Sequence, residues 1–421
     1  PGRMIAAGPV LVLLALLGAP LFAVIAGSAM MGYMREDIDL QALAIEFYGI
    51  AEMPILLAIP LFTFAGYLLS ESGAPRRLVR LTTALLGWMP AGLAIVSLAA
   101  CAFFTAFTGA SGVTIIALGA LLFPALQQGG YPEKFNLGLV TSAGSLGLLF
   151  APSLPLILYG IVAEVSIESL FLAGLLPGFL MILLLSGYSV WKNRAVRVPL
   201  SDFSWREVRS AAREAIWEIP LPIVVLGGIY SGYFAISEAA AVTALYVLII
   251  DVLILREIPL RKLPGVMRES MVLVGGILVI LGMSLASTNY MIDAGVPQKL
   301  LEYVSQLVSS QATFLWLLLG FLLVLGAILD IFSAIVLVVP LILPVAIQYG
   351  VHPVHLGIVF LATMQLGYIT PPVGLNLFIA SYRFDRPIVE LYLSTLPFFF
   401  FLLVSVALIA FWPALSLALL G

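Results

Sequence analysis

Long apolar runs separated by short polar breaks recur along the whole chain. A helix needs about 20 such residues to cross the hydrocarbon core of a bilayer. Runs of roughly that length fall at about residues 5–28, 52–70, 135–160, 169–190, 216–233, 237–255, 270–290, 355–380 and 389–414. Of the 421 residues, 62% are hydrophobic and only 10% are charged, so a soluble fold could not cover this apolar surface. The pattern predicts an all-α polytopic membrane protein, with 5–28 as its first span.

Two pairs of shorter apolar runs predict re-entrant helical hairpins instead of crossings. The first pair forms the segment 91–126 and is interrupted only by Thr108–Gly112; the second forms 313–347 and is interrupted only by Asp330–Ser333. A tight polar turn between two short apolar arms is typical of a hairpin that returns to its own side of the membrane. Prolines that close each second arm favour this interpretation. The alternative is one continuous span with a polar kink.

The runs 135–160 and 355–380 predict helices that are broken at mid-depth. The second contains the consecutive prolines Pro371 and Pro372, which remove backbone donors and leave carbonyl groups without partners. Within lipid, such a gap is tolerated only where it is buried in protein or lines a watery cavity. Small and polar residues accompany both breaks: Gly144, Ser145 and Gly147 in the first, and Gly367, Thr370 and Asn376 in the second.

The basic residues support this topology. With Arg3 in the cytoplasm and each hairpin returning to its own side, 17 of the 19 Lys and Arg residues lie in the cytoplasm, and only Arg35 and Lys299 lie outside. The positive-inside rule expects such a bias. An extra crossing at the first hairpin would place the basic residues from Lys192 to Arg213 outside. We therefore expect a cytoplasmic N-terminus and a C-terminus on the opposite side.

The two halves of the chain match each other at one offset. Each half runs in the order hairpin, short loop, broken helix, loop and final helix, and the two hairpins open from opposite sides in the predicted topology. Secondary transporters bind their cargo at the midplane interface of such inverted repeats. A shift of 220 positions (344 − 124) aligns Pro124 with Pro344, Gln128 with Gln348, Gly130 with Gly350, Gly147 with Gly367, Pro152 with Pro372 and Pro177 with Pro397.

This symmetry divides the chain into a frame and a repeated part. The amphipathic segments Arg77–Trp88 and Pro297–Ser309 either link the hairpins to the frame as arms or are ordinary interfacial helices. The predicted divisions are 1–90 for N-terminal frame spans, 91–190 for the first repeated half, 191–215 for a cytoplasmic linker, 216–312 for further frame spans and an arm, and 313–421 for the second half.

The polar breaks are the candidate sites of chemistry. Hydroxyl and freed carbonyl oxygens suit a small cation, and helix N-termini favour an anion. Asp330 is the carboxylate closest to a hairpin tip; a buried carboxylate in a membrane is functional by default, and the alternative role is that of a helix N-cap. A cap with a first-turn carboxylate explains Glu238, and we expect Asp251 to face an interface or a partner helix.

Several function classes find no support in the sequence. There is one cysteine, the two histidines flank Pro353 without metal-binding spacing, and no nucleotide-binding loop or basic nucleic-acid patch is present. Gly109–Gly112 has the Gly-x-Ser-Gly appearance of an intramembrane serine hydrolase, but the predicted topology puts both histidines in an outside loop, away from Ser111. That enzyme remains a remote alternative, and we expect neither catalysis nor a cofactor.

At these motifs the chain resembles the large membrane subunit of tripartite ATP-independent periplasmic (TRAP) transporters, over essentially its whole length. Thr370–Phe378 is the most specific match. The first broken helix departs from the family pattern, because Ala151-Pro152 stands where a double proline is usual, and Ile236-Ser237 stands where Pro-Thr is usual. The other matching stretches are Phe107–Ser111, Gly144–Tyr159, Phe171–Gly174, Pro177–Gly178, Glu238–Val242, Leu329–Asp330 and Gly367–Ile369.

The resemblance implies a sodium-driven importer of small organic anions, such as sialic acid or a dicarboxylate, in the bacterial inner membrane. A periplasmic binding protein would deliver the cargo, a small four-helix membrane subunit would brace the frame, and the fold would be that of divalent-anion/sodium symporters with an elevator-like moving domain. A stand-alone sodium/anion symporter or exchanger is the alternative. The expected sodium ligands are Gly109, Ser111, Gly112, Ser145, Gly147, Asp330, Ser333, Gly367 and Thr370. The expected substrate contacts are Ser111, Pro152, Ser153, Pro371, Pro372 and Asn376.

Overall fold

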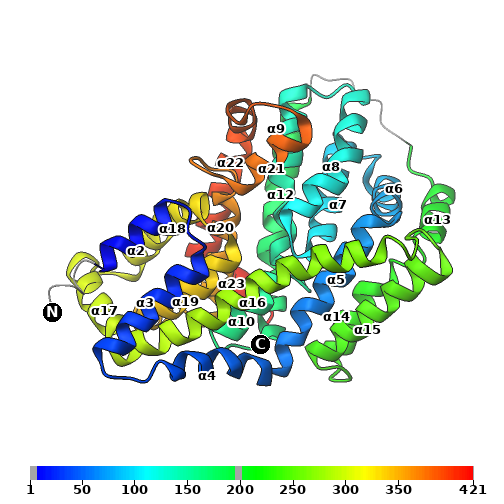
Figure 1. Cartoon of the computed structure of the whole chain (residues 1–421). Helices are drawn as coiled ribbons and strands as arrows, with labels where there is room; N and C mark the ends of the chain where they lie inside the picture. The colour runs from blue at the N-terminus through cyan, green and yellow to red at the C-terminus, as the bar shows by residue number, and fades with distance from the viewer. Residues whose placement is uncertain (1–6, 195–201, 421) are drawn as a thin grey trace.

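The computed structural model describes residues 7–194 and 202–420, and every regular element in these ranges is a helix (Figure 1). Eight of the helices are long and apolar enough to cross a membrane, or up to nine if the bent pair in 133–162 counts as one span. The predicted all-α polytopic class is confirmed. Arg3 and part of the predicted linker, 195–201, lie outside the described residues.

The N-terminal part differs from the prediction of one span over 5–28. Gly18 takes the left-handed conformation (φ +90°), and the following Pro20 cannot continue a helix, so the run divides in two. The first helix packs back against the second, with Leu11 beside Gly27. The elements here are α2 (Ala7–Leu16), α3 (Leu21–Arg35), α4 (Gln41–Gly49), η1 (Ile50–Glu52), η2 (Pro54–Leu57), α5 (Ala58–Glu71) and α6 (Ala74–Leu86).

The first repeated half is a helical hairpin followed by an interrupted helix, as predicted. Gly109 ends the first arm with φ +65°, a conformation that glycine adopts without strain, and the second arm begins at Ser111. The interrupted helix bends by 44° at its break. The elements are α7 (Gly92–Thr108), α8 (Ser111–Gln128), α9 (Glu133–Ala143), η3 (Leu146–Leu149), α10 (Leu154–Val162), α11 (Ile167–Ala173) and α12 (Leu175–Lys192).

The second repeated half has the same order of elements. Its interrupted helix breaks over residues 368–374, and the break is held against the hairpin because Val373 N–H and Gly374 N–H both donate to the Ala327 carbonyl, each at 3.1 Å. The elements are α18 (Gln311–Ile328), α19 (Ile331–Gln348), α20 (Pro353–Gly367), α21 (Leu375–Phe384), α22 (Ile388–Phe411) and α23 (Ala414–Leu417).

Between the halves lies a set of helices dominated by α16, which runs diagonally across the molecule in Figure 1. It contacts α3, α4, α5 and α19. The linker helix α13 packs against α6, where Arg80 pairs with Glu207 at 2.9 Å and with Glu214. The elements are α13 (Trp205–Glu214), α14 (Pro220–Tyr230), α15 (Ile236–Leu248), the π-helix η4 (Ile249–Ile254), α16 (Leu263–Asp293) and α17 (Val296–Leu307). The predicted arms correspond to α6 and α17.

The two halves interlock instead of packing as separate bodies. Helix α21 of the second half lies against α8 of the first, and α10 of the first lies against α19 of the second. The fully buried Tyr159 of α10 donates its hydroxyl to the Pro353 carbonyl at 2.8 Å, which ties the first interrupted helix to the start of α20. Each broken helix therefore depends on the hairpin of the other half.

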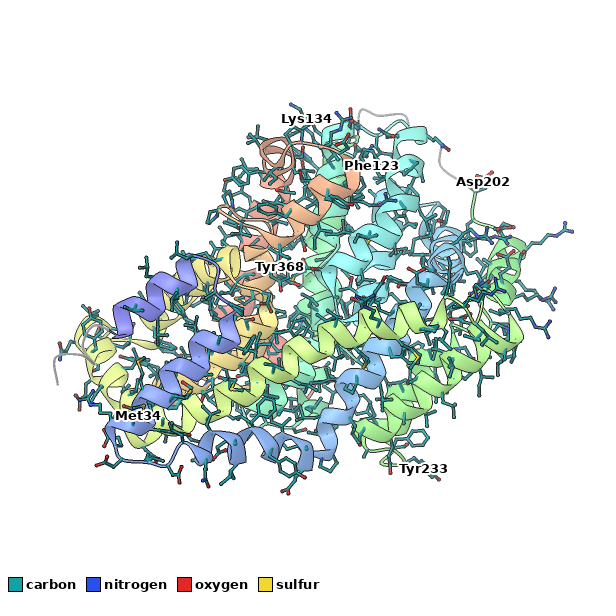
Figure 2. All side chains as sticks on the ribbon, in the orientation of Figure 1. Met34, Phe123, Lys134, Asp202, Tyr233 and Tyr368 are labelled. Carbon is teal, nitrogen blue, oxygen red and sulfur yellow. The ribbon has the colours of Figure 1, made fainter. Side chains whose placement is uncertain are left out.

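The opposite ends of the molecule carry different segments. Figure 2 shows Lys134 and Asp202 near the upper end, Met34 and Tyr233 at the lower end, and Tyr368 in the middle. The residues at the upper end belong to the segments that the charge pattern predicts to be cytoplasmic. Those at the lower end belong to the segments predicted to lie outside.

Candidate functional site

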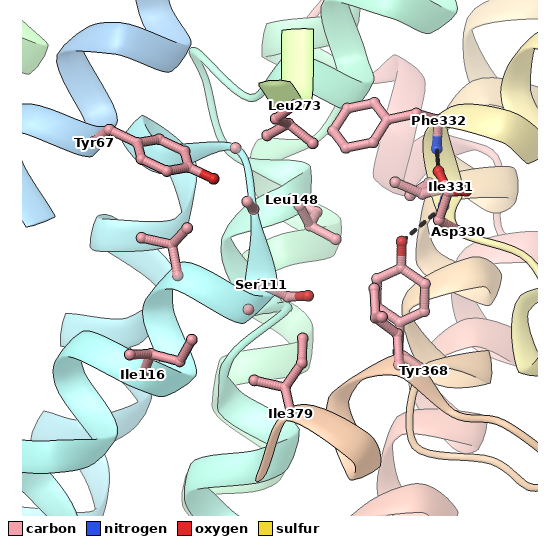
Figure 3. Close-up of a pocket in the computed structure, with 15 residues that line it drawn as sticks. Tyr67, Ser111, Ile116, Leu148, Leu273, Asp330, Ile331, Phe332, Tyr368 and Ile379 are labelled. Atoms are coloured by element: carbon pink, nitrogen blue, oxygen red, sulfur yellow. Dashed lines mark hydrogen bonds between the residues drawn. The ribbon is translucent and has the colours of Figure 1, made fainter. Parts of the chain in front are cut away.

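Both hairpin tips meet around one cavity of about 330 Å³ (Figure 3). Residues 109–113 of the first tip form one side of it, and residues 330–332 of the second tip face them. Tyr368, Leu375 and Ile379 of the second interrupted helix and Leu148 of the first complete the repeated part of the wall. Tyr67 of α5 and Leu273 of α16 close it from outside the repeat. Elements far apart in the sequence thus form one site.

Asp330 is the only charged residue among those that line the cavity. Its Oδ1 accepts hydrogen bonds from the backbone N–H groups of Phe332 and Ser333, each at 3.0 Å, and its Oδ2 accepts from the Ser333 hydroxyl at 2.5 Å. Asp330 is therefore the N-cap of α19, the structural role that its sequence position allows. The cap leaves lone pairs on both oxygens, so capping and cation binding are compatible.

The N-terminus of α8 faces the same cavity without a side-chain cap. Ala110 occupies its N-cap position and has no polar side chain to accept from the first turn. The first N–H groups of a helix have no partner within it, so those of Ser111, Gly112 and Val113 remain free to bind an anion. Ser111 itself projects towards the cavity in Figure 3. The two tips thus differ: one is capped by a carboxylate and the other is open.

The second tip and the second break are joined directly. The Tyr368 hydroxyl accepts a hydrogen bond from Ile331 N–H at 2.7 Å, drawn in Figure 3. The backbone of Gly367 lies against that of Gly326, since a Cβ on Gly367 would come within 2.6 Å of the Gly326 Cα. Tyr368 was not among the predicted site residues, although its place beside the Gly367 break was a signal for it.

Around the first break, hydroxyl and carbonyl oxygens gather in the protein interior. Thr105 Oγ1 lies 2.7 Å from Thr114 Oγ1 and donates to the Gly144 carbonyl at 2.9 Å. Asn376 donates to the Thr141 carbonyl at 3.2 Å and to Ser145 Oγ at 3.3 Å. Three further oxygens here are buried without a hydrogen-bond partner: Thr141 Oγ1, Ser142 Oγ and Asn376 Oδ1.

Buried oxygens that lack donors are costly unless water or a cation reaches them. The cluster around the first break therefore offers the oxygen ligands that a small hard cation prefers. The sequence pattern did not identify Thr105 and Thr114. Each of these threonines lies close to the tip of the first hairpin, one on each arm. A hydroxyl group close to a hairpin tip is therefore the sequence signal that could have identified them.

The predicted site residues separate into three groups. Gly109, Ser111, Gly112 and Asp330 line the cavity, and Ser333 lines an adjoining pocket of about 210 Å³ against α16. Ser145, Gly147, Gly367, Pro152, Ser153 and Asn376 are buried in the packing behind it, and Pro371 and Pro372 are exposed. Thr370 is half-buried, and its hydroxyl donates to the Leu366 carbonyl at 3.0 Å. The two breaks are thus not equivalent: the first is enclosed and the second is open.

Neither histidine serves Ser111 as a base, since both make other contacts. His355 bonds through its two ring nitrogens to Ser416 Oγ at 3.0 Å and to the Ala410 carbonyl at 3.2 Å. His352 accepts from Val354 N–H at 3.2 Å. These are the only histidines of the chain, and both lie at the start of α20.

Comparison with known proteins agrees with these features. The family described as "Tripartite ATP-independent periplasmic transporter, DctM component" matches residues 9–415. The C4-dicarboxylate TRAP transporter large permease protein DctM of Pseudomonas aeruginosa is 35% identical over 382 residues, 90% of each chain. The isethionate TRAP transporter permease protein DctMQ of Oleidesulfovibrio alaskensis is 33% identical over 400 residues, which are 94% of this chain and 62% of that protein.

Relatives with other named cargoes and a solved structure extend the comparison. The ectoine/5-hydroxyectoine large permease UehC of Ruegeria pomeroyi is 31% identical and covers 97% of this chain and 96% of its own. The crystal structure of the Alcanivorax borkumensis YdaH transporter has a TM-score of 0.60 at 15% identity, covering 90% of this chain and 88% of that one, and supports the fold. The chain therefore belongs to the DctM component family of tripartite ATP-independent periplasmic transporters, as a multi-pass membrane permease.

Proposed function

We propose that the chain is the large permease of a sodium-driven importer of small organic anions. The observation that carries this proposal is the single cavity between the two hairpin tips. One wall offers the unpaired N–H groups at the start of α8, and the other offers the Asp330 carboxylate. The relatives named for C4-dicarboxylate and isethionate support an anionic cargo.

An anion in this cavity needs a cation beside it. No Lys or Arg lines the wall, and the negative charge of Asp330 opposes a second negative charge. A sodium ion bound at Asp330 and Ser333 removes that repulsion, so anion and cation binding become mutually dependent. A second sodium ion would use the oxygens around Thr105, Thr114, Gly144 and Ser145. This dependence is the coupling that symport requires.

The cavity wall also supports alternating access of the elevator type. Only Tyr67 and Leu273 come from outside the repeated halves, and the other lining residues belong to the interlocked hairpins and broken helices. We propose that the repeated part moves as one unit past α5 and α16 and carries the cavity with it. The family further supports two partners: a small membrane subunit on the frame and a periplasmic binding protein that delivers the anion. A symporter that works alone is the competing function.

Uptake into vesicles tests the coupling. The sodium gradient is fixed, and potassium with valinomycin sets the membrane potential. Uptake should then require sodium and be unaffected by ATP inside the vesicles. If two sodium ions enter with one monoanion, one net charge moves, which is worth about 2.3 kcal/mol per 100 mV. Accumulation should then rise about tenfold per roughly 60 mV. A dianion with two sodium ions would be insensitive to potential.

The controls for this experiment separate the alternatives. Omitting the binding protein should abolish uptake by the tripartite system and would leave a stand-alone symporter active. A reversible cysteine crosslink between Leu273 and Phe332, which line the same cavity, should stop uptake until it is reduced. Full uptake without sodium, or uptake that needs ATP, would contradict the proposed function.

We propose that the upper end of the molecule in Figure 2, with Lys134 and Asp202, faces the cytoplasm. The positive-inside rule supports this orientation, since Lys134 and the basic linker 191–215, to which Asp202 belongs, are at that end. A single cysteine at Tyr233 should therefore react with an impermeant maleimide added to intact cells, whereas a cysteine at Asp202 should react only after lysis. The reverse pattern would overturn the topology. In the proposed orientation the C-terminus lies on the periplasmic side.

A further inference from the structure

Asp251 lies outside the proposed transport site, in a buried junction of charged side chains. It is 1% exposed and belongs to the π-helix η4, a type of helix that is often found at functional sites. Its backbone carbonyl accepts from Glu257 N–H at 2.9 Å and from Ile258 N–H at 3.3 Å, which fixes the following turn. The buried side chain faces groups on neighbouring helices, in keeping with the expectation from the sequence that it faces an interface or a partner helix.

The junction contains one buried arginine, and two other carboxylates already occupy it. Arg77 Nε donates to Glu218 Oε1 at 2.8 Å, and its Nη2 donates to Glu257 Oε2 at 3.1 Å. Glu257 also accepts from Gly73 N–H at 2.7 Å. Although burial raises the pKa of Glu257, the hydrogen bonds from Arg77 and Gly73 lower it overall. Glu257 is therefore ionised, and the Arg77 guanidinium is engaged by Glu218 and Glu257.

Among the described residues Asp251 forms no ion pair, because Arg77 pairs with Glu218 and Glu257 instead. Its Oδ2 is buried and has no hydrogen-bond partner, and the same is true of Glu218 Oε2. The groups that face Asp251 are Glu257, Glu218, Arg77 and Ser72, with Tyr246 on α15 and Arg76 beside Glu257. Glu218 and Glu257 both pair with the single Arg77, so an ionised Asp251 would add a negative charge that no ion pair compensates. Burying such a charge costs far more than leaving one neutral carboxyl oxygen unpaired.

We propose that Asp251 is a proton-binding site that stays occupied at neutral pH. A proton is the ligand that fits, because it neutralises a buried carboxyl group whose Oδ2 has no hydrogen-bond partner. The neutral carboxyl adds no further negative charge to the junction, in which Arg77 is shared between Glu218 and Glu257. The junction joins the α5–α6 corner, the start of α14 and the turn after η4. Loss of the proton would thus loosen α6, which leads into the first hairpin.

Infrared spectroscopy of the full chain in nanodiscs detects the proton directly. The wild type at pH 7 should show the carbonyl stretch of a protonated carboxylic acid, and Asp251→Asn should remove it. Asp251→Glu keeps a titratable group and should retain a shifted band. Glu257→Gln removes one negative charge near Asp251. The band of the Asp251 carboxyl group should therefore persist in this variant but disappear at a lower pH than in the wild type. A wild-type spectrum without the band at pH 7 would overturn the proposal, whether or not Asp251→Asn folds.

Thermal unfolding across pH gives an independent readout. A carboxyl group whose proton is held more tightly in the folded state stabilises the fold at low pH. This stabilisation is lost as pH rises above the pKa of the group in the unfolded chain, which is about 3.9 for Asp. The wild type should therefore lose more of its Tm between pH 5 and pH 8 than Asp251→Asn does. Parallel curves for the two proteins would contradict a proton on Asp251. Sodium-coupled uptake does not enter either measurement, so the result is independent of the proposed transport mechanism.

Discussion

Replacing Asp330 by asparagine should reduce sodium-dependent uptake at least tenfold while the protein remains folded. Asparagine is as good an N-cap as aspartate, so the bonds from Phe332 and Ser333 N–H to the side-chain oxygen persist. The negative charge is lost, and the amide Nδ2 that replaces Oδ2 cannot accept from the Ser333 hydroxyl, which must turn to accept from the amide instead. A charge 4 Å from a cation contributes about 4 kcal/mol at an effective dielectric constant near 20, and 1.4 kcal/mol is already a tenfold change in affinity. The sodium concentration for half-maximal uptake should rise accordingly.

Two further variants show whether the effect comes from charge or from structure. Asp330→Ala loses the cap as well and should be less stable than Asp330→Asn by about 1 kcal/mol. Ser145→Ala removes a neutral oxygen near the first break and should raise the sodium requirement less, because a neutral ligand contributes less than a carboxylate. Uptake by Asp330→Asn at the wild-type sodium requirement would show that Asp330 serves only as a helix cap.

The architecture followed from the sequence because its signals are local. A polar turn between two apolar arms, or a proline pair inside an apolar run, acts within a few residues, and the structure has a hairpin or a break at each predicted place. The length of the first run does not reveal its division, which Gly18 and Pro20 mark. A glycine and a proline two residues apart give as strong a breaking signal as the later prolines.

The site was only partly predictable because it depends on contacts between distant segments. Residues at the tips, such as Ser111 and Asp330, line the cavity, and their place in the polar turns of the hairpins was a local signal. Asn376 instead reaches across to Thr141 and Ser145 of the other half, a contact 231 to 235 residues away in sequence. No periodicity encodes such a contact. The same holds for Tyr67 and Leu273, which enter the wall from helices outside the repeat.

The glycines that join the second hairpin to its broken helix leave no room for added volume. A Cβ on Gly326 would come within 2.8 Å of the Met364 carbonyl oxygen, and one on Gly367 would come within 2.5 Å of the Gly326 carbonyl carbon. These neighbours are backbone atoms, so no side chain can rotate away. Gly326→Ala and Gly367→Ala should therefore force α18 and α20 apart, displace the second tip from Tyr368 and lower the Tm markedly. Overpacking typically costs about 1–3 kcal/mol, and backbone neighbours place these variants at the upper end.

Gly320 provides the matched control on the same helix as Gly326. A Cβ there would meet no atom within 4 Å, so Gly320→Ala introduces the same methyl group into α18 without a clash. It should leave the Tm unchanged or raise it, since alanine favours a helix by up to about 1 kcal/mol over glycine. Fluorescence-detected unfolding of the three variants, with uptake measured at a temperature where each stays folded, tests the prediction. If Gly326→Ala is as stable and as active as Gly320→Ala, the hairpin and the broken helix are not held at backbone contact, and the second half of the cavity wall must be arranged differently.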